Sequence, residues 1–363
     1  MIKKKYYIGI MSGTSADGID AVIVNFEKKL TILGHAYKKF PIPFSKEIIS
    51  LNKPSQNEIV HSHIVANKIS KLTADLINKL LSKLSLHSDQ IKAIGFHGCT
   101  IRHQPENFMS IQLGNAHLLA KLTGIKVISD FRNADIASKG QGAPLIPLFH
   151  NFLLKCSKKN KAIFLNLGGF ANITVISANE ITGYDCGPGN IYLDYWINKH
   201  KHKRYDDRGK WAKSGQIIKA LLQKLLNDPY FKKKGPKSIG RDYFNEQWLL
   251  RNKPGQYIAN DVQRTLLELT AEVCANQINK YKLINDLYIC GGGTQNDLLI
   301  KRLKEKIVDK NIFFTKHLNV DPQLIEPAGF AWLAKQYINN QKLSYQKITG
   351  SNKANIIGIA YSA

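Results

Sequence analysis

Between Met11 and Ala21 the sequence gathers small and acidic residues whose chemistry suits the phosphates of a nucleotide. Two glycines, three hydroxyl residues and two aspartates occur there: Ser12, Gly13, Thr14, Ser15, Asp17, Gly18 and Asp20. Glycines let main-chain N–H groups approach a ligand closely, and successive N–H groups in a turn form a concavity for anions. The hydroxyls add donors, and aspartate carboxylates suit Mg²⁺. The pattern predicts a phosphate-binding loop.

This loop joins two strands. Residues 6–10 and 21–26 are rich in β-branched and aromatic residues, which is typical of strands. A P-loop or a dinucleotide-binding loop instead runs into a helix and lends the helix N-terminus to the phosphate. The glycine frame at residues 235–241 is followed by no Lys-Ser or Lys-Thr pair, so it is not a P-loop either. The alternative for residues 12–18 is a hairpin that binds nothing.

The strand–glycine–strand pattern returns later in the chain. Residues 161–167 and 171–176 have strand character on either side of Gly168 and Gly169. Two copies suggest two related domains, with the second turn on the far side of the phosphate chain, although a plain hairpin turn is the alternative. A third glycine segment, Gly291–Gly293, ends a buried-type strand and opens a helix, so a flat ligand could press against its backbone.

Other candidate residues stand where strands end and helices begin. His97 and Arg102 follow a strand at residues 91–96, a usual place for ligand contacts in α/β proteins, unless they are loop residues satisfied locally. Asp185 lies among glycines and a proline before a helix and is either an N-terminal turn residue or a rigidly held general base. Glu326 begins the last long helix, where it compensates the helix dipole or acts chemically.

Composition sets the class of protein. The chain has 363 residues, 44% hydrophobic and 22% charged, which suits an ordinary globular protein of two domains. Helical periodicity at residues 56–84 and 261–280 alternates with the strand segments, so the fold class is α/β. No apolar run approaches the roughly 20 residues that cross a bilayer. The first residues lack the features of a signal peptide, so we expect a cytoplasmic protein without a membrane partner.

Charge and cysteine usage exclude other classes. The net charge is +25, but the lysines are spread along the chain and their short clusters contain few aromatic residues. This distribution favours small anionic ligands such as nucleotide phosphates and argues against a nucleic-acid partner. The five cysteines include no C-x-x-C pair, so we expect free thiols and neither a disulfide framework nor a zinc site.

The glycine turns together resemble those of the actin, hexokinase and heat-shock chaperone ATPase superfamily. This resemblance implies two related actin-like, ribonuclease-H-like domains with mixed sheets flanked by helices and a cleft between them. Met11 stands where that superfamily usually carries an aspartate, three residues before the threonine, which leaves Asp17 or Asp20 for the metal.

The string from Gly9 to Asp20 is more specifically similar to the opening signature of the anhydro-N-acetylmuramic acid kinases. Further segments match that family in the same order along the whole chain: 95–105, 110–115, 130–144, 166–172, 185–190, 236–245, 261–271, 291–298 and 326–334. A long signature followed by so many ordered matches is far more specific than any single glycine pair. The chain is therefore identified as a member of this family.

The resemblance implies a coupled hydrolysis and phosphoryl transfer. Water opens the 1,6-anhydro ring at the anomeric carbon, and the freed 6-oxygen takes the γ-phosphate of ATP. The product is N-acetylmuramic acid 6-phosphate, an intermediate in peptidoglycan recycling and amino sugar catabolism. The resemblance also implies ATP and Mg²⁺ as cofactors and a homodimer.

The family's functional residues transfer to matching positions. Asp185 corresponds to the general base, and Glu326 to a second acidic residue near the sugar. His97 and Arg132 are the candidates for orienting the substrate. The predicted ATP and phosphate contacts are Ser12, Gly13, Thr14, Ser15, Asp17, Gly18, Gly168, Gly169, Asn172, Gly291, Gly292 and Asn296, and the predicted magnesium ligands are Asp17 and Asp20.

The sequence also leads to expected domain bounds and leaves two alternative functions open. We expect one actin-like domain from residues 1–130 with 350–363, and a second from residues 131–349 that carries nucleotide and sugar contacts. A kinase of the same superfamily acting on an ordinary sugar or acid is the first alternative function. A basic, non-enzymatic module that is gated by ATP or binds nucleic acid is the second.

Overall fold

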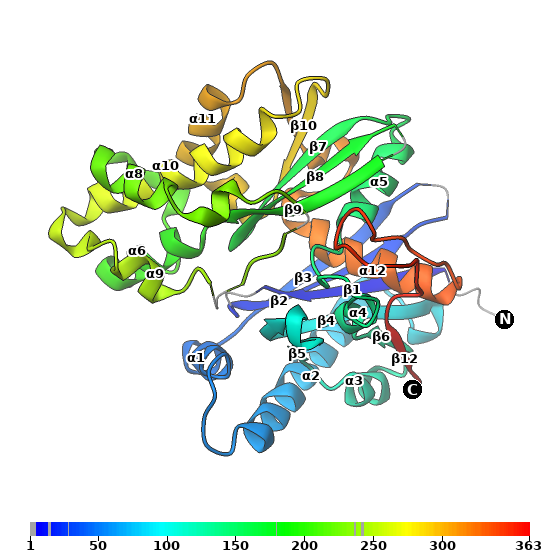
Figure 1. Cartoon of the computed structure of the whole chain (residues 1–363). Coiled ribbons are helices and arrows are strands. Elements are labelled where there is room, and N and C mark those ends of the chain that lie inside the picture. Colours follow the sequence, from blue (N-terminus) through cyan, green and yellow to red (C-terminus); the bar gives the residue numbers. More distant parts are fainter. Residues whose placement is uncertain (1–4, 14–15, 28, 179, 236, 241–242) are drawn as a thin grey trace. The chain divides into compact units, whose positions relative to one another are not determined.

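The computed structural model describes residues 5–13, 16–27, 29–178, 180–235, 237–240 and 243–363. Contacts divide the chain into two compact units (Figure 1). Unit 1 comprises Met1–Cys156 and Leu324–Ala363, and unit 2 comprises Ser157–Gln323. Each unit contains one mixed sheet on which helices pack.

The sheet of unit 1 has seven strands in the order β12-β6-β4-β1-β2-β3, with β5 paired to β4. Their bounds are β1 Tyr6–Ser12, β2 Gly18–Asn25, β3 Thr31–Lys39, β4 Ile91–Gln104, β5 Met109–Leu113, β6 Val127–Ser129 and β12 Ile359–Tyr361. Strands β1, β2 and β3 form an antiparallel meander, whereas β1 pairs parallel with β4, and β4 with β6.

The sheet of unit 2 has five strands in the order β11-β10-β7-β8-β9. Their bounds are β7 Ala162–Leu167, β8 Phe170–Ser177, β9 Glu180–Pro188, β10 Asp286–Cys290 and β11 Asn311–Phe314. Here too a meander, β7 to β9, is followed by parallel pairing of β7 with β10 and of β10 with β11. The repeated order and direction of the strands confirm the α/β prediction of two related domains with mixed sheets.

Helices occupy the connections between strands. In unit 1 they are α1 Ile42–Ser50, α2 Glu58–Lys83, α3 Ala116–Thr123, α4 Phe131–Ile136, α5 Pro147–Cys156 and α12 Ile325–Ile338. In unit 2 they are α6 Ile191–Lys201, α7 Lys210–Lys213, α8 Lys219–Leu226, α9 Glu246–Leu250, α10 Ala259–Ile278 and α11 Asp297–Lys306. Helices α2 and α10 confirm the two predicted from periodicity. In the described part of the chain, no helix is both long and apolar enough to cross a membrane.

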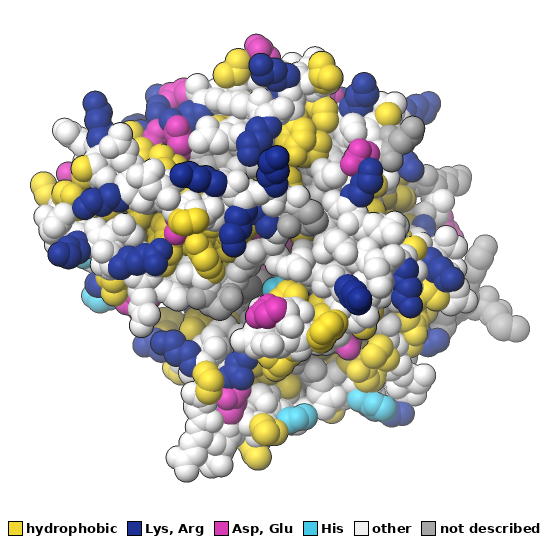
Figure 2. Space-filling model, viewed as in Figure 1, with side chains coloured by type: hydrophobic (Ala, Val, Ile, Leu, Met, Phe, Trp, Pro, Cys, Tyr) yellow, Lys and Arg dark blue, Asp and Glu magenta, His cyan; other side chains and the backbone are white. Residues whose placement is uncertain are grey.

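The distribution of charged side chains and the state of the cysteines both agree with what the composition predicts. On the face drawn in Figure 2, Lys and Arg side chains are scattered among neutral and hydrophobic ones. All five cysteines are free, and Cys156 alone among them is exposed. The prediction of free thiols is therefore confirmed.

Strand β1 separates two packing layers in unit 1. Ile8 and Ile10 belong to a buried hydrophobic cluster that includes residues of α2 and α3. Successive strand residues alternate in direction. A Cβ atom on Gly9 would therefore point to the opposite face, where helix α12 packs on the strand. The central strands are thus covered on both faces, which explains their nearly continuous burial.

Helix α12 lies unusually close to this sheet. A Cβ atom on Gly9 would stand 1.8 Å from the carbonyl oxygen of Pro327, and one on Gly95 would stand 2.0 Å from that of Phe330. Gly9 and Gly95 are direct partners in the β1–β4 register. Two adjacent glycines therefore leave the space in which the helix backbone rests on the strands.

The packing of α12 also determines where the boundaries between the two units fall. Helix α12 packs on β1, β2 and β4 and contacts α5, so its residues group with the N-terminal unit. The boundaries fall after residues 156 and 323, whereas the expected ones were 130 and 349. The difference arises because α5 and α12 pack on unit 1 through contacts between residues far apart in the sequence.

We expect Gly9→Ala to destabilise the protein by at least about 3 kcal/mol, the upper range for overpacking, because backbone atoms have to move to admit the methyl group. Unfolding in urea followed by circular dichroism would measure it. Gly255→Ala is the matched control, since a Cβ there meets nothing within 4 Å. Equal stabilities of the two variants would contradict the close contact between α12 and β1.

Candidate active site

A row of polar side chains crosses three neighbouring strands of unit 2. Asn166 on β7 pairs with Asn172 on β8, which in turn pairs with Asp185 on β9. Side chains opposite each other on paired strands share a face. The residues beside them in sequence, such as Leu165, Ile173 and Cys186, belong to the hydrophobic cluster that includes α10. The polar row therefore lies on the face turned away from α10.

Asp185 is buried and held from three directions. Its main-chain N–H donates to the carbonyl oxygen of Lys237 at 3.0 Å, and the N–H of Ile239 donates to its Oδ2 at 2.8 Å. The Tyr230 hydroxyl donates to its main-chain oxygen at 2.9 Å. Asp185 belongs to strand β9, and Asn190 is the residue before α6. Of the two predicted roles, the N-terminal turn residue is thereby excluded.

The segment that braces Asp185 is itself anchored on Asp228. The Tyr243 hydroxyl donates to Asp228 Oδ1 at 2.8 Å, and the Trp248 indole N–H donates to Oδ2 at 2.7 Å. The main-chain N–H of Tyr230 also donates to Oδ1, at 2.9 Å. Asp228 is buried and accepts from residues on both sides of the Lys237–Ile239 segment. This carboxylate therefore fixes the ends of the loop that carries the brace.

The predicted glycine turn lies between β7 and β8 and is bonded to the start of α6. The N–H groups of Gly189 and Ile191 donate to the carbonyl oxygen of Gly169 at 2.9 and 3.0 Å, and that of Asn190 donates to Gly168 at 2.9 Å. A Cβ atom on Gly189 would stand 2.4 Å from the Gly168 oxygen. The turn is consequently more rigid than an isolated hairpin.

The third glycine segment meets the same strand ends. Gly291 has φ +86°, and a Cβ atom there would stand 2.4 Å from the side-chain oxygen of Asn166. A Cβ on Gly293 would approach Leu167, whereas one on Gly292 would meet nothing within 4 Å. The Asn296 side-chain oxygen accepts from Leu299 N at 3.0 Å and so caps α11. Unit 2 thus gathers both predicted glycine segments beside the polar row.

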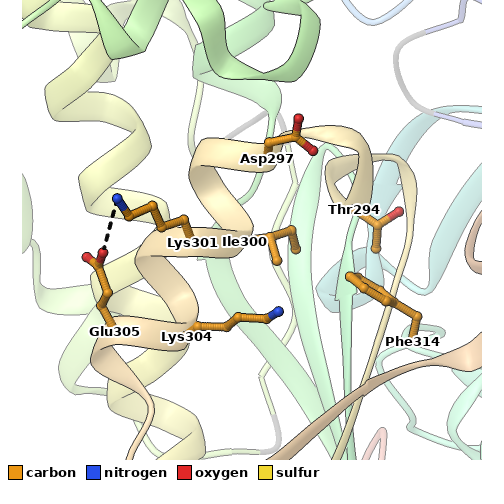
Figure 3. A pocket seen from close by; sticks show the side chains of 7 residues that line it. All are labelled: Thr294, Asp297, Ile300, Lys301, Lys304, Glu305 and Phe314. Atoms are coloured by element: carbon orange, nitrogen blue, oxygen red, sulfur yellow. Dashed lines mark ion pairs between the residues drawn. The ribbon is translucent and has the colours of Figure 1, made fainter.

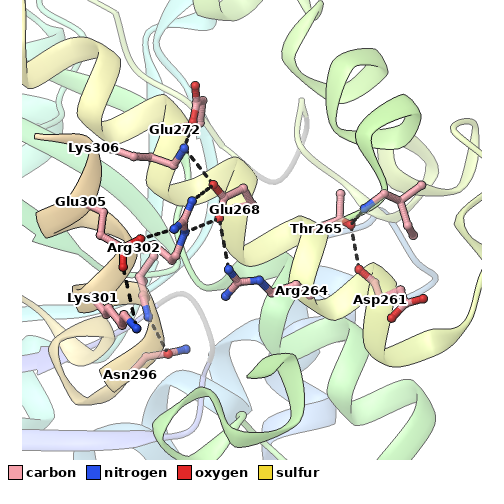
Figure 4. Close-up of polar contacts among 12 residues, drawn as sticks. Asp261, Arg264, Thr265, Glu268, Glu272, Asn296, Lys301, Arg302, Glu305 and Lys306 are labelled. Atoms are coloured by element: carbon pink, nitrogen blue, oxygen red, sulfur yellow. Dashed lines mark hydrogen bonds and ion pairs between the residues drawn. The ribbon is translucent and has the colours of Figure 1, made fainter. Parts of the chain in front are cut away.

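Helices α10 and α11 are joined by an ion network that fixes this arrangement (Figure 4). Glu268 on α10 is 2% exposed and accepts from Arg302 Nη2 at 2.7 Å and Nε at 2.9 Å, with Lys306 Nζ at 2.8 Å. Burial alone would raise the pKa of Glu268, but the hydrogen bonds from Arg302 and Lys306 outweigh it and hold the pKa below its usual range. On the same helix, the Thr270 hydroxyl donates to Gly189 O at 2.9 Å. Helix α10 therefore touches both the α6 start and α11.

A surface hollow of about 520 Å³ lies along α11 (Figure 3). It is lined by Thr294, Asp297, Ile300, Lys301, Lys304, Glu305 and Phe314. Thr294 directly follows the Gly291–Gly293 segment, and its hydroxyl donates to Gly291 O at 2.7 Å. The predicted ATP contacts in unit 2 lie outside this lining.

In unit 1 the predicted first loop closes on itself. The Ser12 hydroxyl donates to Gly18 O at 2.8 Å, and Ala16 N donates to Gly13 O at 3.0 Å. The main-chain oxygen of Asp17 accepts from Phe40 N at 2.8 Å. Thr14 and Ser15 lie outside the described residues. The described contacts join the two ends of this loop.

The two predicted metal ligands differ in their surroundings. Asp17 is exposed, whereas Asp20 is partly buried and its Oδ1 lies 2.9 Å from His35 Nε2. Within the described ranges, no three His, Cys, Asp or Glu side chains come together as a metal site. Mg²⁺ usually keeps several waters and uses one or two protein carboxylates together with substrate phosphates. One or two aspartates beside the predicted phosphate loop fit that mode of binding.

His97 and Arg132, the predicted substrate contacts, touch each other in unit 1. Arg132 Nε donates to His97 Nε2 at 3.0 Å, and Arg132 Nη1 donates to Gly142 O at 2.8 Å. Since Nε2 accepts, Nδ1 carries the proton and donates to Gly98 O at 2.9 Å. Burial, and then the Arg132 charge, hold the pKa of His97 well below its usual range. A neutral histidine therefore fixes the arginine.

Glu326 and Arg102 complete the set of predicted residues. Glu326 is partly buried in the first turn of α12. Arg102 and His97 both lie within strand β4, which runs to Gln104, so the expected strand end at residue 96 is wrong. Arg102 Nη2 pairs with Glu58 Oε1 at 2.5 Å.

Several residues of the candidate site were not predicted from the sequence. Asn166 was not singled out, although it stands one residue before a predicted strand end and occupies the same row as Asp185. The brace at Lys237 and Ile239 and the Thr270 contact also went unrecognised. The available signal was the resemblance of residues 236–245 and 261–271 to family segments, which marks these stretches without saying what they touch.

Comparison with known proteins shows the class and then the family. The chain is a kinase-family protein along nearly its whole length: residues 5–363 match the model of "Anhydro-N-acetylmuramic acid kinase". The protein of that name from Pseudomonas savastanoi pv. phaseolicola is 41% identical over 362 residues, covering 99% of both chains. The one from Nitrosomonas europaea is 41% identical over 363 residues, covering 99% of this chain and 100% of the relative. The chain belongs to the anhydro-N-acetylmuramic acid kinase family.

Solved structures show more distant likeness. The activator of the 2-hydroxyisocaproyl-CoA dehydratase from Clostridium difficile, with bound ADPNP, is 12% identical with a TM-score of 0.46 and covers 93% of this chain and 99% of its own. A ROK family glucokinase from Streptomyces griseus, in complex with glucose and AMPPNP, is 13% identical with a TM-score of 0.41 and covers 91% and 99%.

We expect Glu268→Gln to lower the free energy of unfolding by roughly 3 kcal/mol, because Arg302 and Lys306 lose a buried counter-charge. Urea unfolding followed by tryptophan fluorescence would measure this. Since the folded pKa of Glu268 is depressed, its contribution is present above the unfolded value of about 4.3 and is lost as the pH falls. The stability gap between wild type and variant should therefore close in acid.

Lys301→Gln is the control for this prediction. Its partner Glu305 lies 3.9 Å away, and the two side chains are 72% and 39% exposed. Such surface pairs contribute about 0–1 kcal/mol. A loss from Glu268→Gln no larger than that of the control would contradict the role of the network.

Proposed function

We propose that this chain is an ATP-dependent kinase of 1,6-anhydro-N-acetylmuramic acid. Water opens the anhydro ring while the 6-oxygen is phosphorylated, giving N-acetylmuramic acid 6-phosphate and ADP, a step in peptidoglycan recycling and amino sugar catabolism. The family to which the chain belongs supports the reaction. The geometric support is Asp185, a buried carboxylate that is fixed on its strand beside two glycine segments.

The reaction balances with a single base. The oxygen of water bonds to the anomeric carbon, the bond from that carbon to the 6-oxygen breaks, and the 6-oxygen bonds to the γ-phosphorus as the bond to ADP breaks. One proton leaves the attacking water, and Asp185 would accept it. A carboxylate that activates water must stand back far enough to admit it, as in an inverting glycosidase.

The brace on Asp185 suits that task. The Ile239 N–H fixes one carboxylate oxygen at 2.8 Å, and the bond from Asp185 N to Lys237 O fixes the main chain. A base whose orientation is set before substrate binds loses little entropy on the way to the transition state. The Asn166 and Asn172 side chains on the same row would add polar contacts to the substrate or the phosphates.

The glycine segments would hold ATP. Phosphoryl transfer depends mainly on positioning and charge neutralisation. In unit 2, the turn at Gly168 and Gly169 would contact phosphate. Gly291 with Gly292 would contact the nucleoside, since a Cβ atom on Gly292 would meet nothing within 4 Å and the backbone there is open. Asn296 would serve chiefly by capping α11. In unit 1, the loop from Ser12 to Gly18 would contact phosphate as well.

Asp17 and Asp20 would hold Mg²⁺ on the first loop. When bound, the ion would neutralise the charge of the phosphates. Asp17 lies within the loop and Asp20 stands two residues after Gly18, so both are a short stretch of chain from the predicted phosphate contacts.

The sugar would be oriented by groups of unit 1. Arg132 is fixed by His97 and by Gly142 O, and its guanidinium would pair with the lactyl carboxylate of the substrate. Glu326, in the first turn of α12, would serve as the second acidic residue near the sugar.

The same proposal includes a cytoplasmic homodimer without nucleic-acid or membrane partners.

Mass spectrometry in heavy-oxygen water would test the reaction. The purified protein is mixed with Mg-ATP and 1,6-anhydro-N-acetylmuramic acid, and early products are analysed before anomeric exchange. We expect one heavy oxygen in the phosphorylated sugar, because the new anomeric oxygen comes from water. N-acetylmuramic acid with an open ring is the control, since its anomeric oxygen should not be replaced during phosphorylation.

Two outcomes would contradict the proposal. A phosphorylated sugar without heavy oxygen would point to an ordinary sugar kinase. ATP hydrolysis without any sugar product would remove the kinase assignment altogether.

We expect Asp185→Asn to lower kcat by about 10²–10⁴, the usual contribution of a general base, while ATP affinity stays nearly unchanged. The amide keeps an oxygen for the Ile239 N–H but cannot accept a proton from water. Turnover assays and nucleotide titrations would separate the two effects. Asp207→Asn removes an exposed carboxylate of the same unit, paired with Lys210, and should leave turnover near that of wild type. Wild-type turnover in Asp185→Asn would exclude it as the base.

A further inference from the structure

Helix α4 carries Arg132 and, three residues later, a buried aspartate. Asp135 is 1% exposed and was not among the candidate residues of the sequence. A carboxylate is seldom buried unless it is paired or hydrogen-bonded, because it loses its hydration there. The contacts of Asp135 therefore indicate what its position is for.

The chain that follows α4 turns tightly around this carboxylate. Gly142 N donates to Asp135 Oδ2 at 2.7 Å, and a Cβ atom on Gly140 would stand 2.2 Å from the same oxygen. Gly142 has φ +67°, a backbone conformation that favours glycine. The Asp135 carboxylate therefore fixes the position of the Gly142 main chain.

Gly142 in turn holds Arg132. The Gly142 carbonyl oxygen accepts from Arg132 Nη1 at 2.8 Å, while its N–H donates to Asp135. On the other side of the guanidinium group, His97 Nε2 accepts from Arg132 Nε at 3.0 Å. A single residue thus connects the buried carboxylate to the guanidinium group, and every contact in this relay lies within unit 1.

A residue near the C-terminal end of the chain secures the same aspartate from a second direction. Thr349 Oγ1 donates to Asp135 Oδ1 at 2.8 Å, across 214 residues of sequence. Thr349 is 1% exposed, and its carbonyl oxygen accepts from Gln141 N at 2.9 Å. Both oxygens of the Asp135 carboxylate therefore accept from a defined donor, and the turn around them is tied to the C-terminal segment.

We infer that Asp135 is a positioning residue that orients Arg132, through Gly142, toward the lactyl carboxylate of the substrate, and that Thr349 holds Asp135 in place. This inference rests on the proposed function, in which Arg132 pairs with that carboxylate. The planar fork of an arginine suits a carboxylate only in a particular orientation. An arginine that has lost an anchor keeps its charge but must be ordered when the ligand binds, which costs affinity. Asp135 therefore determines how strongly the site prefers an acidic sugar to a neutral one.

Calorimetric titration of the full-length chain with two sugars would test this. One sugar is 1,6-anhydro-N-acetylmuramic acid, and the other is its lactyl amide, which keeps the shape of the acid but lacks its charge. The wild type should bind the acid more tightly, and the ratio of the two Kd values measures this preference. In Asp135→Ala the preference should fall about tenfold, because Gly142 N loses its acceptor and Arg132 loses a fixed anchor.

Three further variants separate the possible causes. Asp135→Asn keeps an oxygen for the Gly142 N–H, and its amide can donate to the Thr349 hydroxyl, so most of the preference should remain. Asp75→Asn removes an exposed carboxylate of α2 in the same unit and should leave both Kd values unchanged. In an Arg132→Ala background, Asp135→Ala should no longer change the preference, because the residue through which it acts is absent.

A purely structural role gives a different result. Asp135→Ala would then weaken the binding of both sugars by the same factor and leave the preference unchanged, which would overturn the inference. A change of preference that persists in the Arg132→Ala background would overturn it as well.

Thr349→Val keeps the inference testable if Asp135→Ala fails to fold. Valine has nearly the shape of threonine but lacks the hydroxyl, so Asp135 loses one donor. The preference should fall about threefold, the equivalent of a weak hydrogen bond, and an unchanged preference would overturn the inference. A wild type without any preference would overturn it together with the proposed role of Arg132, whereas the heavy-oxygen experiment tests the proposed reaction separately.

Discussion

The structure depends on a few contacts in which main-chain atoms of one segment pack directly against main-chain atoms of another. Gly9 and Gly95 let α12 lie against β1 and β4, and Gly189 and Gly291 let the loops of unit 2 lie against the ends of β7. No side chain can enter these contacts without moving main-chain atoms. The positions of the helix and the loops are therefore set by the sheets themselves, which have little freedom to deform in a close-packed interior.

Buried acids form the second constraint. Asp185, Asp228 and Glu268 are each almost inaccessible to solvent, and each accepts hydrogen bonds from defined donors. A buried charge is tolerated when it is paired and hydrogen-bonded, and removing one partner leaves the other exposed to the full desolvation penalty. The donors come from segments distant in sequence, so these acids tie the loops of unit 2 to the strands and helices.

Local patterns predicted the parts of the site but not how they meet. The glycine turns, the helices at α2 and α10 and the candidate base Asp185 followed from composition, periodicity and resemblance. The row formed by Asn166 and Asp185 depends on strand register, and the brace from Ile239 crosses a long loop whose path no local pattern encodes. Glu326 was expected in the second domain, whereas α12 packs on the first, because the contact requires Gly9 to lie opposite a helix far away in sequence.

Helix α10 gives unit 2 a common scaffold for its chemistry. Thr270 bonds to Gly189, which bonds to the turn at Gly169, while two residues before Thr270 the Glu268 carboxylate holds α11. The same helix packs on β9, the strand of Asp185. A displacement of α10 would therefore move the proposed base Asp185, the proposed phosphate turn and the start of α11 together. In the proposed reaction, such coupling would preserve the distances on which proton abstraction and phosphoryl transfer both depend, so that the two steps could share one arrangement of unit 2.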